Sequence, residues 1–216
     1  MPRSIVRAAT VALLTATLAA ICHAETTVPL TNPVFEDGFN GWQMSPPPWL
    51  ETIDNTVFHS GGASARLYKQ SWGSYLWQVV PYTAAPGDKL TFSFWYRETG
   101  DNSVKWLGSE LTLSTSSDMW NGSARVLDVG IPVLAPNPDW THVQVTGVVP
   151  GSVAPGDYWL GVMLQTGGGN GGPYNGSAWI DDVRVTANAV PEPAFLQLAG
   201  LLALGGIGAL RLRKRG

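Results

Sequence analysis

Aromatic side chains beside polar ones are the most distinctive feature of this 216-residue sequence, which contains ten tryptophans. An indole or phenol ring offers an apolar face on which a sugar ring stacks, and neighbouring polar groups then bind the sugar hydroxyls. The residues that we expect to form such a ligand-binding platform are Trp72, Tyr75, Trp77, Trp95, Arg97, Trp106 and Glu110. The alternative is that these rings pack in the core or at its rim, which is our interpretation of Trp42, Trp140 and Trp179.

Asp181 lies in the run SAWIDDVRV and has the same sequence parity as Val183 and Val185. Residues two apart in a strand point to the same side, so we expect the Asp181 carboxylate to point inward. An unpaired carboxylate in a core is costly, and a hard cation with oxygen ligands would remove that cost. The alternative is a bulge at the strand end that leaves Asp181 and Asp182 in water.

Sequence motifs for catalysis are missing from the chain. There is no G-x-S-x-G, no H-E-x-x-H and no phosphate-binding glycine loop followed by lysine. Beyond the amino-terminal segment only His59 and His142 remain as histidines, and they are far apart in sequence. A carboxylate pair for glycoside hydrolysis would not show as a motif, so a hydrolase or lyase stays open as the lesser alternative. We predict no catalytic residues and no enzyme activity.

The elements that must position these side chains are short strands. In LTFSFWYR, residues 90–97, every second residue is a large apolar or aromatic one, and Trp95 and Arg97 fall on the opposite side. YWLGVMLQ, residues 158–165, alternates in the same way. Turn-forming pieces such as APGDK, APNPD and TGGGNGGPYNG separate further short runs. This pattern, without helical periodicity, predicts an all-β fold built as an antiparallel β-sandwich.

Three pieces of the chain, in order, resemble a known family. They are TNPVFEDGFNGWQ, FHSGGASARLYKQSWGSYLWQVVPYTAAPGDKLTFSFWYR and SAWIDDVRVT. The series is similar to the jelly-roll carbohydrate-binding modules of glycanases, in the galactose-binding-like superfamily, over residues 28–187. The resemblance implies a two-sheet jelly roll, sugar bound on a concave sheet face or at loop tips, and a structural calcium ion. It places Glu36 where the family supplies a second carboxylate, so the expected Ca²⁺ ligands are Glu36, Asp181 and backbone carbonyls.

The amino-terminal segment, residues 1–24, reads as a secretory signal peptide. Arg3 and Arg7 precede an apolar stretch, and small residues up to Ala24 mark a cleavage point for signal peptidase. Cys22 is the only cysteine, so the exported domain contains no disulfide. The formal net charge is −3, and six of the thirteen basic residues lie in the two end segments, so the central domain is acidic, which argues against a nucleic-acid partner.

The carboxy-terminal segment, residues 190–216, combines Pro191-Glu192-Pro193, an apolar run and an arginine-rich end that includes Arg211 and Arg213. The run is just long enough for a transmembrane helix, and the basic end would stay in the cytoplasm. The three parts resemble the PEP-CTERM sorting signal. That family implies recognition by an exosortase, in Gram-negative bacteria that make exopolysaccharide. A permanent membrane anchor is the alternative.

The sequence thus predicts a signal peptide (1–24), a carbohydrate-binding-module-like β-sandwich (25–189) and a sorting signal with a transmembrane helix (190–216). We expect an exported protein, tethered at least transiently to the membrane and then delivered to the cell surface or the extracellular biofilm matrix. Its expected role is polysaccharide binding without catalysis. The alternatives are a structural matrix protein without sugar binding and, less favoured, a glycan-active hydrolase or lyase.

Overall fold

A computed structural model describes residues 25–44, 51–68, 74–98, 106–134, 137–167 and 177–188 of the chain. The predicted signal peptide with Ala24 and the predicted sorting signal, including Pro191, Glu192, Pro193, Arg211 and Arg213, lie outside these residues. The predicted ligand residue Trp72 does as well. Within the described ranges, no helix is long and apolar enough to cross a membrane.

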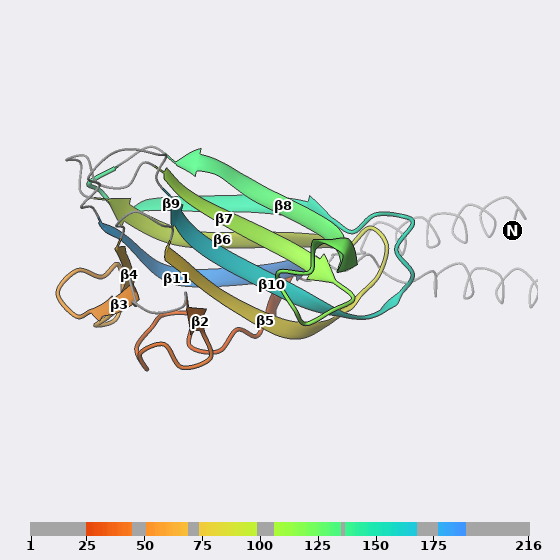
Figure 1. The fold of residues 1–216 in the computed structure, drawn as a ribbon, viewed down its shortest axis with the longest axis horizontal. Helices are drawn as coiled ribbons and strands as arrows, with labels where there is room; N and C mark the ends of the chain where they lie inside the picture. Colours follow the sequence, from red (N-terminus) through yellow and green to blue (C-terminus); the bar gives the residue numbers. More distant parts are fainter. Residues whose placement is uncertain are drawn as a thin grey trace, which may run out of the picture. The chain divides into compact units, whose positions relative to one another are not determined.

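The described chain consists of strands and one short 3-10 turn, η1 (Gly122–Ala124), as the alternating pattern predicts. The strands pair antiparallel in two sheets, which Figure 1 shows as stacked layers. The six-stranded sheet contains β3 (Glu51–Asp54), β4 (Ser64–Tyr68), β11 (Ser177–Asn188), β6 (Lys89–Glu98) and β9 (Thr141–Val148), in this order, and β1 (Glu25–Val28), which pairs with β11. The five-stranded sheet has the order β2 (Gln43–Met44), β5 (Ser74–Ala84), β10 (Gly156–Gly167), β7 (Trp106–Ser114) and β8 (Arg125–Leu134).

The inner faces of the two sheets form one hydrophobic core. Phe92 and Phe94 of β6 are fully buried, as are Leu160 and Leu164 of β10. The opposite side of β6, with Trp95 and the residues of the same parity, is partly exposed. The alternation read from residues 90–97 is therefore confirmed, and so is the antiparallel β-sandwich.

One end of this interior is polar. Glu98, at the end of β6, has no exposed surface, and neither of its carboxylate oxygens has a hydrogen-bond partner in the described part of the chain. The hydroxyls of Ser109 and Thr166 are also buried without a partner there. Figure 1 shows the end of β6, the start of β7 and the end of β10 at the same end of the sandwich. Burial raises the pKa of Glu98 to about 7, because the ionised form loses its hydration.

Candidate functional site

The outer face of the five-stranded sheet carries three of the predicted ligand residues. Tyr75 and Trp77 alternate with buried residues of β5, so their side chains stand on this face. Met163 of β10 pairs with Trp77 on one side and with Glu110 of β7 on the other. Directly paired residues point to the same side of a sheet, so these three side chains form a row across it.

A loop between β7 and β8, residues 115–124, folds back over this face. Met119 of the loop is buried, and it packs above Gly161 of β10. A Cβ atom at Gly161 would lie 2.6 Å from Thr112 Oγ1 and 3.1 Å from Met119 Sδ. The loop can lie this close to the sheet because residue 161 has no side chain.

Trp120, in this loop, completes a cluster of three aromatic rings. It meets Tyr75 at a centroid distance of 5.7 Å and Trp77 at 5.5 Å, with interplanar angles of 81° and 77°. These edge-to-face contacts fix the orientation of the indole, yet 55% of Trp120 stays exposed. We call Tyr75, Trp77 and Trp120 the aromatic cluster. It presents a rigid and accessible ring surface on the outer face of the sheet.

Sequence reasoning missed Trp120. The residue lies in SSDMWNGS, between two strands, where no alternation assigns a side chain to a face. Its partners Tyr75 and Trp77 lie in a run that the sequence shows as a strand. The loop that carries Trp120 packs onto the sheet through Met119 and Gly161, which are distant from that run in sequence. Nothing in the local sequence signals this contact over such a separation along the chain.

A charged network borders the aromatic cluster. The Arg125 guanidinium donates to Asp128 Oδ2 at 2.6 Å and to the Met119 carbonyl at 2.9 Å, and it lies 3.4 Å from Glu110 Oε2. Arg125 therefore anchors the loop to the sheet. Burial raises the pKa of Glu110, and the Arg125 charge opposes this shift. Arg125 Nε and Glu110 Oε2 are buried without a hydrogen bond to any described residue.

The remaining predicted platform residues do not join this cluster. Trp95 and Arg97 lie on the outer face of the other, six-stranded sheet, where Trp95 pairs with His142 and Arg97 with Trp179. The His59 ring lies flat on Trp95 at 3.9 Å and 14°, so one face of this indole is already covered. Of Trp106 only the backbone, at the start of β7, is described. The predicted platform is thus divided between two opposite faces.

The expected metal ligand Asp181 is buried, but not for the predicted reason. A bulge between Asp181 and Arg184 breaks the parity, and Asp181 pairs with Trp95 instead of sharing the inward side of Val183. The bulge alternative is also only half right, because Asp181 has no exposed surface. Its Oδ2 accepts the N–H groups of His59 at 2.9 Å and Ser60 at 3.0 Å, so this loop covers it.

Glu36 and Asp181 bind the two ends of the same segment, residues 59–63. Glu36 Oε1 accepts the N–H groups of Gly62 at 2.7 Å and Ala63 at 3.3 Å. Burial raises the pKa of Asp181, and its backbone hydrogen bonds oppose this shift. Within the described residues, no three Asp, Glu, His or Cys side chains converge as a metal-binding group. A cation here would rely on these two carboxylates and on backbone carbonyls.

The fold is similar to that of several solved structures. A family 16 carbohydrate-binding module matches with a TM-score of 0.51 and 14% identity, over 72% of this chain and 97% of that one. The CBM22-1 xylan-binding domain of Xyn10C from Paenibacillus barcinonensis matches with a TM-score of 0.50 and 11% identity, over 78% and 99%. A Stig cyclase from Fischerella sp. TAU matches with a TM-score of 0.55 and 16% identity, over 77% and 100%.

No protein-family model matches the chain, and no curated protein matches it in sequence. At these identities the structural matches show a shared fold, a jelly-roll β-sandwich like that of carbohydrate-binding modules. The predicted fold class of the central domain is therefore confirmed at this level. Because cyclases share the fold, it does not by itself select a function.

Proposed function

We propose that the aromatic cluster binds a polysaccharide chain without catalysing a reaction. The observation that carries this proposal is Trp120, which is 55% exposed while Tyr75 and Trp77 hold it edge to face. A large exposed ring costs free energy in water unless a partner covers it, and a sugar face is such a partner. The Glu110 and Arg125 side chains beside the cluster supply acceptors and donors for sugar hydroxyls.

The test is affinity electrophoresis of the full chain through gels that contain defined polysaccharides, such as xylan, β-glucan, galactan and mannan. Retardation in at least one gel is expected, and Trp120→Ala should weaken it at least tenfold, or about 1.4 kcal/mol. Phe58→Ala is the matched control, because Phe58 is an aromatic residue that is 38% exposed outside this cluster. Folded protein that no gel retards would favour a structural matrix protein without sugar binding.

Catalysis is not part of this proposal, because Arg125 contacts the two carboxylates of the charged network beside the aromatic cluster. Its Nη1 atom contacts both Glu110 and Asp128, so both carboxylates of this network are engaged by one guanidinium group. A glycosidase needs its two carboxyl groups on either side of the bond to be cut, one as acid and one as base or nucleophile. We therefore expect no release of reducing ends from any polysaccharide that the protein binds. Release that stops in Glu110→Gln would instead establish a hydrolase.

Calcium is proposed as a structural ion at Glu36 and Asp181. Glu36 Oε2 accepts no hydrogen bond from the described residues, and Asp181 is a buried carboxylate whose charge a cation would balance. The ion would hold the 59–63 segment against β11 at Asp181. A melting temperature that rises with calcium and falls with chelator is expected, and Glu36→Gln should abolish the difference. Equal melting curves in both conditions would remove calcium from the proposal.

The export and sorting roles rest on the sequence of the two ends. We propose that signal peptidase removes residues 1–24 and that an exosortase processes the chain near Pro191-Glu192-Pro193. Immunoblots of cell fractions with one antibody against the β-sandwich and one against residues 205–216 test this. The mature surface protein should react with the first antibody only. Reaction with both would indicate a permanent membrane anchor.

A further inference from the structure

A polar hollow of about 340 Å³ lies on the outer face of the six-stranded sheet, opposite to the face with the aromatic cluster. Its lining residues come from adjacent strands in register. Ser93 of β6 pairs with Arg184 of β11 and with Gln144 of β9, and Trp95 pairs with His142 one step along. The hollow is at the lower end of the volumes that small-ligand pockets have.

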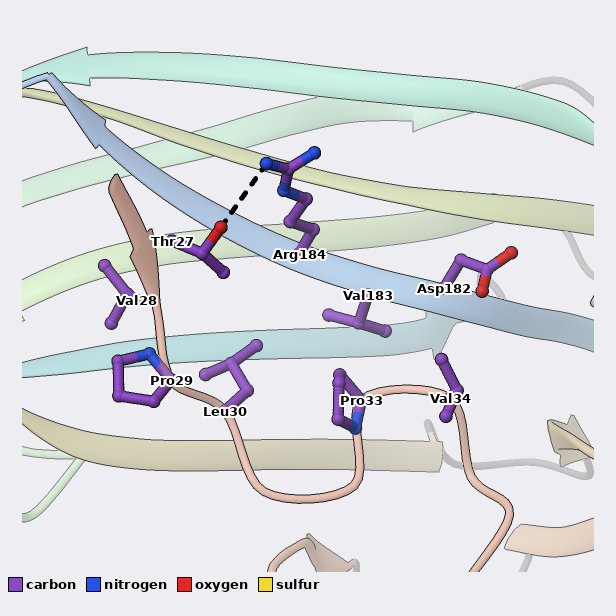
Figure 2. Close-up of a pocket in the computed structure, with 9 residues that line it drawn as sticks. All are labelled: Thr27, Val28, Pro29, Leu30, Pro33, Val34, Asp182, Val183 and Arg184. Carbon is purple, nitrogen blue, oxygen red and sulfur yellow. Dashed lines mark hydrogen bonds between the residues drawn. The ribbon is translucent and has the colours of Figure 1, made fainter. Parts of the chain in front are cut away.

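The bulge in β11 shapes this hollow. Asp182 has a φ of 50°, a left-handed conformation that is uncommon for a residue with a side chain. Figure 2 shows Asp182 and Arg184 reaching to the same side of β11, and Arg184 bound to Thr27 of β1 at 3.3 Å. The Asp182 carboxylate accepts hydrogen bonds from the His59 ring and the Ser60 hydroxyl, each at 2.6 Å. These two hydrogen bonds fix the Asp182 carboxylate at the edge of the hollow.

The polar groups in the hollow still have free hydrogen-bonding capacity. In the described part of the chain, no hydrogen bond engages the Ser93 hydroxyl or the Gln144 amide. Each oxygen of Asp182 binds one described residue and can accept a second hydrogen bond. Acceptors, donors and an aromatic wall formed by Trp95 therefore meet in one place.

The charges around the hollow indicate an uncharged ligand. Asp182 and Glu25 contribute two carboxylates, against one guanidinium from Arg184. Removal of residues 1–24 would add the positively charged amino group of Glu25, so the charges around the hollow would cancel. This balance favours a neutral sugar, whose hydroxyls both donate and accept hydrogen bonds. We propose that the hollow is a second carbohydrate site, which takes one neutral sugar residue. This second site rests on the proposed function only for the class of its ligand. With both sites, one domain would hold two glycan chains on opposite faces.

The test uses saturation-transfer NMR of the full chain with the methyl glycosides of glucose, galactose, mannose and xylose. At least one glycoside should bind, and Trp120→Ala should leave its dissociation constant unchanged. The double variant Ser93→Ala, Gln144→Ala should raise that constant about tenfold, through the loss of two hydrogen bonds. Neither side chain bonds to another described side chain, so folding should be preserved. Val148→Ala is the control, because Val148 is 50% exposed on the same strand and outside the hollow.

Two results would overturn this second site. One is binding that is equal in wild type and the double variant. The other is binding that disappears in Trp120→Ala, which would assign the glycoside to the aromatic cluster. If polysaccharide gels retard the protein but none of the four glycosides binds, the second site is refuted while the proposed function stands. If glycosides bind through Ser93 and Gln144 but no gel retardation depends on Trp120, the proposed function fails and the second site stands.

Discussion

Glu98 makes the stability of this domain depend on pH in a direction opposite to that of most carboxylates. The pKa of its buried carboxyl is raised from 4.5 to about 7. Between these values the folded state keeps a proton that the unfolded state has lost, so the free energy of unfolding falls as pH rises. At about 1.36 kcal/mol for each pH unit, the loss between pH 4.5 and pH 7 amounts to about 3 kcal/mol.

Glu98→Gln tests this reasoning, because the amide cannot ionise. We expect the variant to gain about 3 kcal/mol relative to wild type between pH 4.5 and pH 8, in urea unfolding curves measured at each pH. Comparing the two proteins at the same pH cancels the titration of all other groups. The gain is a large fraction of the 5–15 kcal/mol that typically stabilises a domain.

Glu51→Gln is the matched control. Glu51 is 4% exposed, but its Oε1 atom accepts hydrogen bonds from the Ser74 hydroxyl at 2.7 Å and the Tyr75 N–H at 3.0 Å. Removing a charged acceptor that is already satisfied should destabilise the domain at pH 8, the opposite sign to Glu98→Gln. Parallel stability curves for wild type and Glu98→Gln from pH 4.5 to pH 8 would refute the assignment of a protonated Glu98.

Three further substitutions test other parts of the structure. Gly161→Ala places a Cβ against Thr112 and Met119 and lifts the loop with the exposed tryptophan, so polysaccharide retardation should weaken at least fivefold. The melting temperature should also fall, because Met119 would lose its buried position. Gly61→Ala should destabilise the domain by about 1–3 kcal/mol in urea unfolding, because the φ angle of Gly61 is 65° and an added Cβ would collide with Glu36. Gly62→Ala is the control and should be neutral, because its Cβ would meet no atom closer than 3.6 Å. For Asp54, burial raises the pKa, but hydrogen bonds from neighbouring side chains and backbone outweigh this and lower it to about 2. Asp54→Asn should therefore cost stability at pH 7, and the difference from wild type should close as pH falls from 4 towards 2.

The strands were predictable because burial in a sandwich follows the period of a strand. In residues 90–97 the inward side carries Phe92 and Phe94, and a shift of the strand register by one residue would turn both rings towards solvent. The same logic failed at Asp181, where a bulge of one extra residue reverses the parity that the sequence displays. Bulges depend on the neighbouring strand and loop, so alternation within one segment does not reveal them.

The candidate site was predictable only in its strand residues. Tyr75 and Trp77 were expected to join the platform as aromatic residues of one short run, but such a run does not indicate which of the two sheets its strand enters. For this reason Trp95 was grouped with them although it lies on the opposite face. Trp120 depends on a loop contact between distant parts of the chain, and such contacts are set by packing and not by local pattern.

The position of β11 determines how the domain would respond to mechanical force. β11 is hydrogen-bonded on one side to β4 and then to β1, and on the other side to β6 over nearly its whole length. A pull on Asn188 along the strand would load these ladders together, in shear, because no end of the strand can peel away alone. Glu25 pairs with Asn188, so β1 would have to slide at the same time. If the domain binds a polysaccharide while it is tethered through Asn188 at the end of β11, many hydrogen bonds acting in parallel would resist its extension.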